Sequence, residues 1–339
     1  MATMKEIAAL AGVSVSTVSK GLRNANDIGD ETRKRIKNIA TDLGYTYRAP
    51  SKQTRYTKTP NIGIICPEIL SHYYSQMLTS MENALSKEGY ATFISISGFR
   101  PEVEKRLLRL YTDLVLDGII CITEGSTIQA YLGNLFSDRH IPFVLVSNQQ
   151  AVHKFDFFDI DDDHAVRIAV EHLISLGHRS IGYIGGHLSR KRKDLYLKYL
   201  SDGNIQIDGS YVIESDRRFE DCGYTGMLSI LSSENRPTAV FCAYDAIAIG
   251  AMRAVYEQNV TIPDEMSIIS IDDVSEASFL HRSLTTVSGP SSQMGKMSAD
   301  NLIDQIESQE NHVVQHISLK PRLIVRETTA PPKSVVNPD

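Results

Sequence analysis

The sequence of this 339-residue chain predicts a small helical domain that contains a helix-turn-helix, followed by a larger α/β core with doubly wound sheets. Three observations predict this fold. Near the amino terminus, two short helical patterns flank a glycine. After residue 60, apolar segments of strand length alternate with amphipathic segments of helix length. The first 59 residues are basic, and the rest of the chain is acidic.

The predicted helix-turn-helix spans Met4 to Lys20. Gly12 allows a sharp turn after the first helix, and Ser14 is a suitable N-cap for the second, in which Val18 faces inward. The first helix carries apolar residues at helical spacing, which are Ile7, Ala8, Leu10 and Ala11. The outer face of the second helix has side chains short enough to reach base edges in a major groove: Val15, Ser16, Ser19 and Lys20. The alternative is an ordinary helix pair in an all-α domain.

A third helix is predicted to begin at Asp30-Glu31-Thr32 and to end at Gly44-Tyr45. Its buried stripe consists of Ile36, Ile39, Ala40 and Leu43. Residues 1–59 hold 11 Lys and Arg against 5 Asp and Glu, a net charge of +6, whereas the remaining residues have a net charge of −12. This asymmetry directs the first domain, and not the core, toward the phosphates of a nucleic acid.

The core is predicted from alternating strands and helices. The strands are Ile62–Cys66, Ala91–Ile96, Gly118–Ile122, Phe143–Val146, Phe157–Ile160, Ser180–Ile184, Val212–Glu214, Ala239–Cys242 and Ser267–Ile271. The helical segments are Tyr74–Lys87, Val103–Leu116, Ala165–Leu176, Tyr224–Leu231 and Ala246–Gln258. Most strands are apolar throughout, which is typical of sheets covered by helices on both faces.

The alternation is too long for one open sheet, and a break near Asp159–Asp163 indicates two lobes that face each other across a cleft. Ligands of such sheets bind beyond the carboxyl ends of the strands. The segments expected at this mouth are Pro67–Tyr74, Thr123–Glu124, Asp161–Asp163, Gly185–Lys193 and Asp272–Asp273.

Other classes of protein are disfavoured. No charged-then-apolar leader and no membrane-spanning segment is found, and the cysteines Cys66, Cys121, Cys222 and Cys242 lack metal-ligand spacing, so we expect buried free thiols in a cytoplasmic protein. Gly289 to Lys296 differs from a phosphate-binding loop in its spacing and in Met297. We therefore expect no enzyme activity, no metal and no cofactor.

With these motifs the sequence resembles the lactose/galactose repressor family of bacterial transcription regulators, and the resemblance continues to about Arg326. It implies a homodimeric repressor that binds double-stranded operator DNA and responds to a small carbohydrate-like effector. It also implies a core similar to periplasmic sugar-binding proteins: residues 1–59 as DNA-binding domain with hinge, 60–161 and 291–322 as lobe 1, 162–290 and 323–330 as lobe 2. Residues 331–339 are Pro-rich, without a leucine heptad, and are expected to be a disordered tail.

The resemblance places DNA contacts on the second helix and in the hinge. The matching helix positions are Val15, Ser16, Thr17 and Lys20, although Val15 is also explained as a structural residue near the cap. In the hinge, Thr54 stands where relatives insert a leucine into the minor groove, so a weaker kink is expected. The hinge keeps its positive charge through Arg48, Lys52 and Arg55. Alternatively, these residues form a solvated basic linker that adds only nonspecific affinity for DNA.

The resemblance also selects ligand-binding candidates in the cleft. They are Tyr73, Tyr74, Asp161, Arg190, Arg192, Arg218, Tyr244 and Asp272. Tyr73 and Tyr74 are suited to stacking on a sugar ring, with packing at a helix start as the alternative. Arg192 matches the arginine that clamps the ligand in relatives, and Arg190 competes for this role. Arg218 stands where relatives have an aromatic residue, and together with Arg192 it favours an anionic ligand such as a sugar acid. A regulator switched by a partner protein, a sugar-binding protein and an enzyme are the alternative functions.

Overall fold

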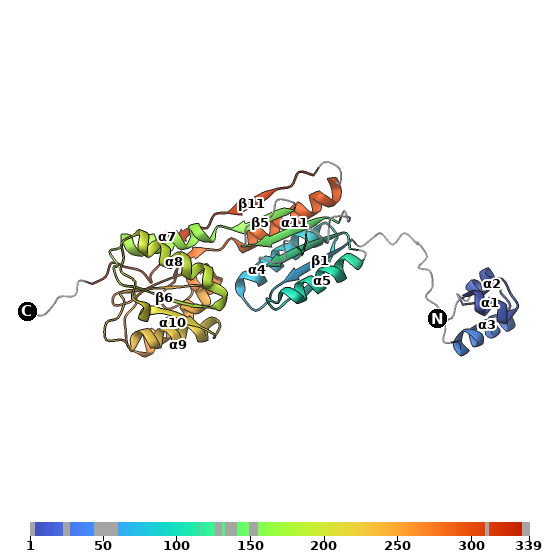
Figure 1. Cartoon of the computed structure of the whole chain (residues 1–339), viewed down its shortest axis with the longest axis horizontal. Helices are drawn as coiled ribbons and strands as arrows, with labels where there is room; N and C mark the ends of the chain where they lie inside the picture. The colour runs from blue at the N-terminus through green and yellow to red at the C-terminus, as the bar shows by residue number, and fades with distance from the viewer. Residues whose placement is uncertain are drawn as a thin grey trace, which may run out of the picture. The chain divides into compact units, whose positions relative to one another are not determined.

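The computed structural model of the chain describes residues 4–22, 28–43, 60–114, 116–125, 131–132, 141–148, 155–308 and 312–333. The chain divides into two compact units, Met1–Thr59 and Pro60–Asp339 (Figure 1). In the part of the chain that is described, no helix combines the length and the apolar character needed to cross a membrane.

The first unit is a three-helix domain. Its helices are α1 (Met4–Ala11), α2 (Val15–Leu22) and α3 (Asp30–Asp42). Gly12 adopts a φ of 63° in the turn, and the Ser14 hydroxyl accepts a hydrogen bond from the Thr17 backbone N–H over 3.1 Å, so the predicted N-cap is confirmed. The buried core consists of Ile7, Ala8, Ala11, Val18, Ile36 and Ala40. Leu43 is 38% exposed, which corrects its predicted place in the buried stripe of the third helix, and Leu10 of α1 is 64% exposed.

The second unit contains two six-stranded sheets, which define two lobes. Lobe 1 has the strand order β11-β5-β4-β3-β1-β2, and lobe 2 has the order β12-β10-β9-β8-β6-β7. All the pairings are parallel except that of β10 with β12. In lobe 1, α4 and α11 pack together on one face of the sheet and α5 packs on the other; in lobe 2, α7 and α8 face α9 and α10 across the sheet (Figure 1).

Most of these elements follow the predicted alternation, but the last three strands, β10, β11 and β12, were not predicted. The strands are β1 (Asn61–Cys66), β2 (Ala91–Ile96), β3 (Gly118–Thr123), β4 (Phe143–Ser147), β5 (Asp156–Ile160), β6 (Ile181–Gly186), β7 (Val212–Ser215), β8 (Ala239–Cys242), β9 (Ser267–Asp272), β10 (Thr285–Ser288), β11 (His316–Leu319) and β12 (Leu323–Ile324). The helices are α4 (His72–Lys87), α5 (Pro101–Asp113), α7 (Asp162–Ser175), α8 (Arg190–Asp202), α9 (Phe219–Leu231), α10 (Asp245–Glu257) and α11 (Ser291–Ser308).

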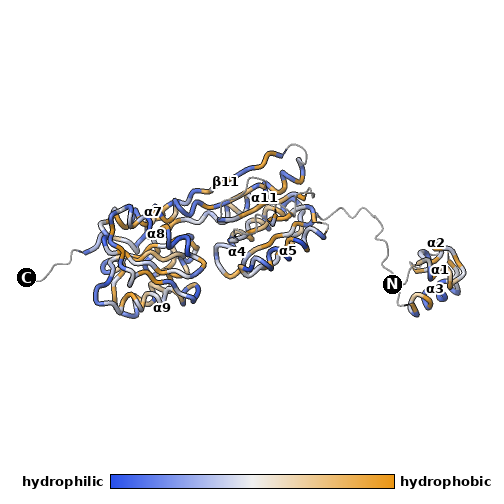
Figure 2. The backbone as a smooth tube through the Cα atoms, viewed as in Figure 1, coloured by the Kyte–Doolittle hydropathy of each residue, from blue (hydrophilic) through white to orange (hydrophobic). Residues whose placement is uncertain are grey.

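Burial explains which residues form the strands. β3, β4 and β8 are buried along their whole length, because helices cover both faces of their sheets. Hydrophobic residues accordingly concentrate along the strands of both lobes (Figure 2). β2 is different, since it lies at the edge of its sheet and exposes Phe93, Ile94 and Ile96. All four cysteines are free and buried, as predicted.

The chain passes between the lobes after β5, after β10 and after β11, which brings the carboxyl ends of both sheets to one cleft. Two helices in this unit were not predicted. α8 begins with four basic residues that resemble a polar loop. α11 buries small polar residues such as Ser291 and Ser298 beside its apolar ones, which weakens the apolar pattern of the helix. The disordered tail was predicted to begin too early, because Lys333 pairs with Asp264 at 3.1 Å. Residues 334–339 lie outside the described residues.

Candidate ligand cleft and DNA-reading helix

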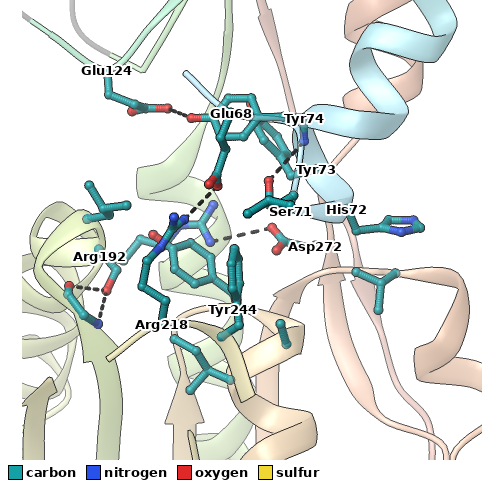
Figure 3. Close-up of a pocket in the computed structure, with 18 of the residues that line it drawn as sticks. Glu68, Ser71, His72, Tyr73, Tyr74, Glu124, Arg192, Arg218, Tyr244 and Asp272 are labelled. Carbon is teal, nitrogen blue, oxygen red and sulfur yellow. Dashed lines mark hydrogen bonds and ion pairs between the residues drawn. The ribbon is translucent and has the colours of Figure 1, made fainter. Parts of the chain in front are cut away.

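A cavity of about 630 Å³ lies between the two lobes, at the carboxyl ends of their strands (Figure 3). It is lined from lobe 1 by residues that follow β1, β2, β3 and β4. From lobe 2 it is lined by residues that follow β6, β7, β8 and β9, and by Asp162, where the chain enters lobe 2 after β5. This position agrees with the general rule for ligands of doubly wound sheets. Of the predicted ligand residues, the cavity is lined by Tyr73, Tyr74, Arg190, Arg192, Arg218, Tyr244 and Asp272.

Arg192, in the first turn of α8, is the central charge of the cleft. Its guanidinium lies 3.1 Å from Asp162 and 3.7 Å from Asp272, donates to the Ala243 carbonyl over 2.7 Å, and lies 5.0 Å from the centre of the Tyr244 ring. Burial opposes the charge, but the two carboxylates outweigh burial and hold the pKa of Arg192 above its ordinary value. The arginine is therefore a permanent cation that is fixed by four groups of its own lobe.

Asp272 ends β9 in an unusual backbone conformation. Its φ is 137° and that of Asp273 is 56°, both in the region that L-residues disfavour. The buried Asp245 carboxylate holds this turn by accepting the Val274 backbone N–H over 2.9 Å. Burial raises the pKa of Asp272 to about 8, although Arg192 opposes the increase. The turn thus places a carboxyl group beside the guanidinium of Arg192.

Tyr73 and Tyr74 begin α4 on the opposite wall, where Ser71 caps the helix. Tyr74 is buried, and its hydroxyl donates to Glu124 over 2.7 Å; Tyr73 is half-buried and meets the Tyr74 ring edge-on at 5.0 Å. Burial raises the pKa of Glu124 to about 7, against the hydrogen bond from Tyr74. The ring of Tyr74 therefore packs in the core of lobe 1, which is the packing alternative for this residue, and its hydroxyl faces the cleft.

Arg218, the N-cap residue of α9, reaches from lobe 2 to lobe 1. It donates to the Glu68 carboxylate over 2.8 Å, and its guanidinium lies over the rings of Phe99 and Phe219 at 5.5 and 4.4 Å (Figure 3). Glu68 is buried. Both Arg192 and Arg218 therefore have carboxylate partners within the cleft, so the two arginines by themselves do not favour an anionic ligand.

Two of the predicted ligand residues require correction. Asp161 does not line the cavity; its carboxylate caps α7 by accepting the His164 backbone N–H over 2.9 Å, and the next residue, Asp162, faces the cleft. Arg190 lies at the rim, where its side chain is 69% exposed and pairs with Glu214 at 2.9 Å. Arg192, not Arg190, is the buried arginine, because α8 begins at the rim and turns its third residue inward.

The cleft also contains acidic residues that were not predicted as ligand contacts, namely Glu68, Glu124 and Asp162. All three lie in segments that the sequence placed at the mouth of the cleft, and Glu124 follows a buried strand directly. The ion pairs of Glu68 and Asp162 had no sequence signal, since their partners lie 150 and 30 residues away. Among the described residues, no group of three or more His, Cys, Asp or Glu side chains is placed to hold a metal ion.

In the first unit, the candidate DNA-contacting residues lie on α2. Val15, Ser16 and Lys20 are exposed and Thr17 is half-buried, whereas Val18 is fully buried. The Ser14 hydroxyl lies 2.7 Å from that of Ser16 and 2.8 Å from that of Thr17. α2 therefore presents Val15, Ser16 and Lys20 to solvent, as a recognition helix would. The predicted hinge residues Arg48, Lys52, Thr54 and Arg55 lie outside the described residues.

A helix-turn-helix domain joined to a two-lobed ligand-binding core defines a class of DNA-binding regulators. The family of bacterial regulatory proteins named after lacI matches residues 3–47, and a periplasmic binding protein-like domain matches residues 170–329. The HTH-type transcriptional repressor PurR of Edwardsiella ictaluri is 32% identical over 338 residues, which cover 97% of each chain. The chain therefore belongs to the lacI family of bacterial regulatory proteins and is a DNA-binding transcriptional regulator.

Solved structures agree with this fold. The Lac repressor dimer bound to operator and the anti-inducer ONPF superposes with a TM-score of 0.71 at 24% identity, covering 97% of this chain and 99% of that chain. A lacI family regulator from Enterococcus faecium with bound ribose has a TM-score of 0.68 at 25% identity, covering 80% of this chain and 100% of that chain.

Proposed function

We propose that this protein represses transcription as a homodimer on operator DNA, and that a small carbohydrate-like effector bound in the cleft controls its affinity for the operator. The observation that carries the proposal is the Arg192 site. It combines a buried guanidinium, the adjacent Asp272 carboxyl and two tyrosine rings, Tyr73 and Tyr244, around one cavity. Charged groups that pair with hydroxyls, beside aromatic faces, suit a polyhydroxylated ring.

Control of DNA binding follows from linkage. The cleft is formed by both lobes, so a ligand that contacts both stabilises one arrangement of the lobes over another. The effector changes operator affinity only by its differential affinity for these arrangements, and operator DNA changes effector affinity by the same factor. On the DNA side, Val15, Ser16 and Lys20 are proposed to contact base edges, and the basic hinge is proposed to contact phosphates.

An apolar surface of lobe 1 supports the proposed dimer. The edge strand β2 exposes Phe93, Ile94 and Ile96, the neighbouring α5 exposes Leu110, and Leu114 is exposed directly after α5. Tyr111 of α5 donates to the Phe93 carbonyl over 2.9 Å, which keeps the helix against the strand. An exposed edge strand with apolar side chains is typical of a surface that a second chain covers.

Because a regulator acts where its DNA lies, we also propose a cytoplasmic location.

The test measures operator binding and effector binding on the full chain. Operators are selected from random double-stranded DNA, and their affinity is measured by fluorescence anisotropy with and without each member of a panel of sugars, alditols and sugar acids. We expect at least one compound to bind by calorimetry and to change operator affinity, and Arg192→Gln to abolish that change. If no small molecule alters operator affinity and a partner protein from the cell does, the proposal of a carbohydrate effector is wrong.

Sedimentation of Phe93→Glu tests the dimer. We expect this variant to be monomeric at concentrations where the unmodified chain is dimeric, because it places a charge in the apolar surface. Ile207→Glu, at an exposed apolar residue of lobe 2, is the matched control. A dimer that persists in Phe93→Glu would place the interface elsewhere.

A further inference from the structure

The cleft contains more carboxylates than guanidinium groups to pair with them. Four inward-facing carboxyl groups line it: Glu68, Glu124, Asp162 and Asp272. Arg192 is shared by Asp162 and Asp272, and Arg218 pairs with Glu68. Of the other charged residues that line the cavity, Arg190, Arg217, Glu220 and Glu276 are exposed to solvent at its rim. Lys191 is exposed too, and its ammonium group donates to the Asn148 carbonyl over 2.6 Å. Among the described residues, the two guanidinium groups of Arg192 and Arg218 thus face four carboxyl groups inside the cleft.

Among the described residues, Glu124 is the cleft acid for which no ion pair is found. One carboxylate oxygen accepts from the Tyr74 hydroxyl over 2.7 Å, and the other accepts from the Asn148 amide over 3.4 Å. In the part of the chain that the structure describes, these hydrogen-bond partners are both neutral. Glu124 lies across the cleft from Asp272 and also borders a second cavity of about 200 Å³ (Figure 3). A ligand group beside Glu124 therefore has space.

The electrostatics of the site agree with an excess of acid. Burial, with a smaller contribution from Asp162, raises the pKa of Glu124 to about 7, and the Tyr74 hydrogen bond, Arg192 and Lys191 oppose this only in part. Burying a carboxylate without a cationic partner is unfavourable in free energy. A ligand cation that donates a hydrogen bond to the carboxylate removes this cost. A ligand carboxylate would add one more negative charge to the same cavity.

We infer that the effector carries a protonated amino group on a polyhydroxylated skeleton, and that Glu124 binds this group while Arg192 and Asp272 bind hydroxyls. This inference rests on the proposed function and names the chemical class of its effector. An amino sugar or an amino alditol has the required groups, because its hydroxyls offer both donors and acceptors and its ammonium group offers three N–H donors.

The test compares compounds that differ in one terminal group. For the gluco, galacto and manno skeletons, the 1-amino-1-deoxyalditol, the alditol and the aldonate have the same hydroxyl groups along the rest of the chain. Binding of each compound to the full chain is measured by calorimetry, and operator affinity is measured in parallel. In at least one skeleton we expect the amine to bind at least about tenfold more tightly than the alditol, and the aldonate most weakly, since charge-assisted hydrogen bonds have this magnitude.

The variant Glu124→Gln tests whether Glu124 causes the preference for the amine over the alditol. The change keeps the shape of the side chain and an oxygen that accepts from Tyr74, so we expect the fold to remain and the preference for the amine to fall to about threefold or less. Glu171→Gln is the matched control, because it removes a surface carboxylate that pairs with Arg167 on α7. We expect this control to retain the full preference.

The outcomes separate the two proposals. If an alditol or aldonate binds as tightly as the amine in every skeleton and changes operator affinity, the ammonium inference is overturned and the proposed function stands. If Glu124→Gln keeps the amine preference, Glu124 is not its cause, and the inference is overturned. If no compound in the trios binds, the ammonium inference is overturned, and the broader sugar panel decides the proposed function.

Discussion

Arg218 of lobe 2 donates a hydrogen bond to Glu68 of lobe 1 over 2.8 Å, and this ion pair joins the two lobes across the cleft. The guanidinium is held over the rings of Phe99, from lobe 1, and Phe219, from lobe 2. Glu68 is buried, so the hydrogen bond from Arg218 offsets the cost of placing its carboxylate away from water. The pair therefore favours the arrangement in which the lobes lie close together.

Weakening this ion pair is expected to weaken effector binding. Glu68→Gln leaves a neutral partner for Arg218, which makes the closed arrangement less favourable by about 1 kcal/mol and lowers effector affinity by about fivefold. Calorimetry measures the affinity. Asp221→Asn is the matched control, because Asp221 pairs with Arg217 within lobe 2 alone. Equal affinities in all three proteins would show that the pair does not contribute to closure.

Arg192 is expected to serve both stability and effector response. Arg192→Gln leaves Asp162 and Asp272 buried without their cation, so we expect the free energy of unfolding to fall by about 2–4 kcal/mol. Operator affinity is expected to become independent of the effector. Urea denaturation and anisotropy measure the two effects. Arg190→Gln, at the exposed rim residue, is expected to lower the free energy of unfolding by less than about 0.5 kcal/mol. If Arg190→Gln had the larger effects of the two variants, Arg190 would be the ligand-clamping arginine.

The pH dependence of stability follows from the buried acids of the cleft. The pKa values of Glu124 and Asp272 are raised to about 7 and about 8 in the folded protein, above their ordinary values of 4.5 and 3.8. The folded state therefore binds more protons than the unfolded state between these limits, so the free energy of unfolding is expected to fall as pH rises from 5 to 8. Each group contributes a slope of at most about 1.4 kcal/mol per pH unit.

Urea denaturation without effector, at several pH values, measures this slope. Glu124→Gln is expected to make the slope shallower, since the raised pKa of this carboxyl is lost. The charged groups that act on Glu124 are Asp162, Arg192 and Lys191, and Arg192 keeps its charge throughout this range. A profile that is flat, or identical in the variant, would contradict the assignment.

Base reading is expected to depend on Lys20. Lys20→Ala should weaken binding to the selected operator by about 1–3 kcal/mol and binding to random DNA much less, because a base contact is made only at the specific site. Anisotropy on both DNAs measures the difference. Lys37→Ala, at an exposed position of α3, is the control. An equal loss on both DNAs would mean that Lys20 contacts only phosphate.

The hinge prediction rests on the sequence alone. Because Thr54 stands at the position of a minor-groove wedge, Thr54→Leu should increase DNA bending and tighten operator binding, most at sites with a flexible pyrimidine–purine step in the centre. A circular-permutation gel shift measures the bend. Strong bending by the unmodified chain, with no change in Thr54→Leu, would assign the wedge to another residue, such as Tyr56.

Local patterns in the sequence determined the helix-turn-helix and most of the alternating core. The Gly12 turn, the Ser14 cap and the apolar strands up to Ser267–Asp272 each depend on neighbours in the chain, so residue spacing was sufficient to predict them. Residue spacing could not predict α8 and α11. The start of α8 consists of basic residues, which are typical of a polar loop. In α11, small residues interrupt the apolar stripe, because the helix packs closely against α4: a Cβ at Gly295 would lie 2.3 Å from the Met77 carbonyl oxygen.

Only the tertiary structure decided the charge of the cleft. The sequence placed Arg192, Arg218 and Asp272 at the mouth correctly, and from the two arginines it favoured an anion. Their partners Asp162 and Glu68 come from other strand ends, and one of them comes from the other lobe. An ion pair depends on which side chains the fold brings within 4 Å, and burial then sets its strength. For this reason the excess of acid at Glu124 could be recognised only in the folded chain.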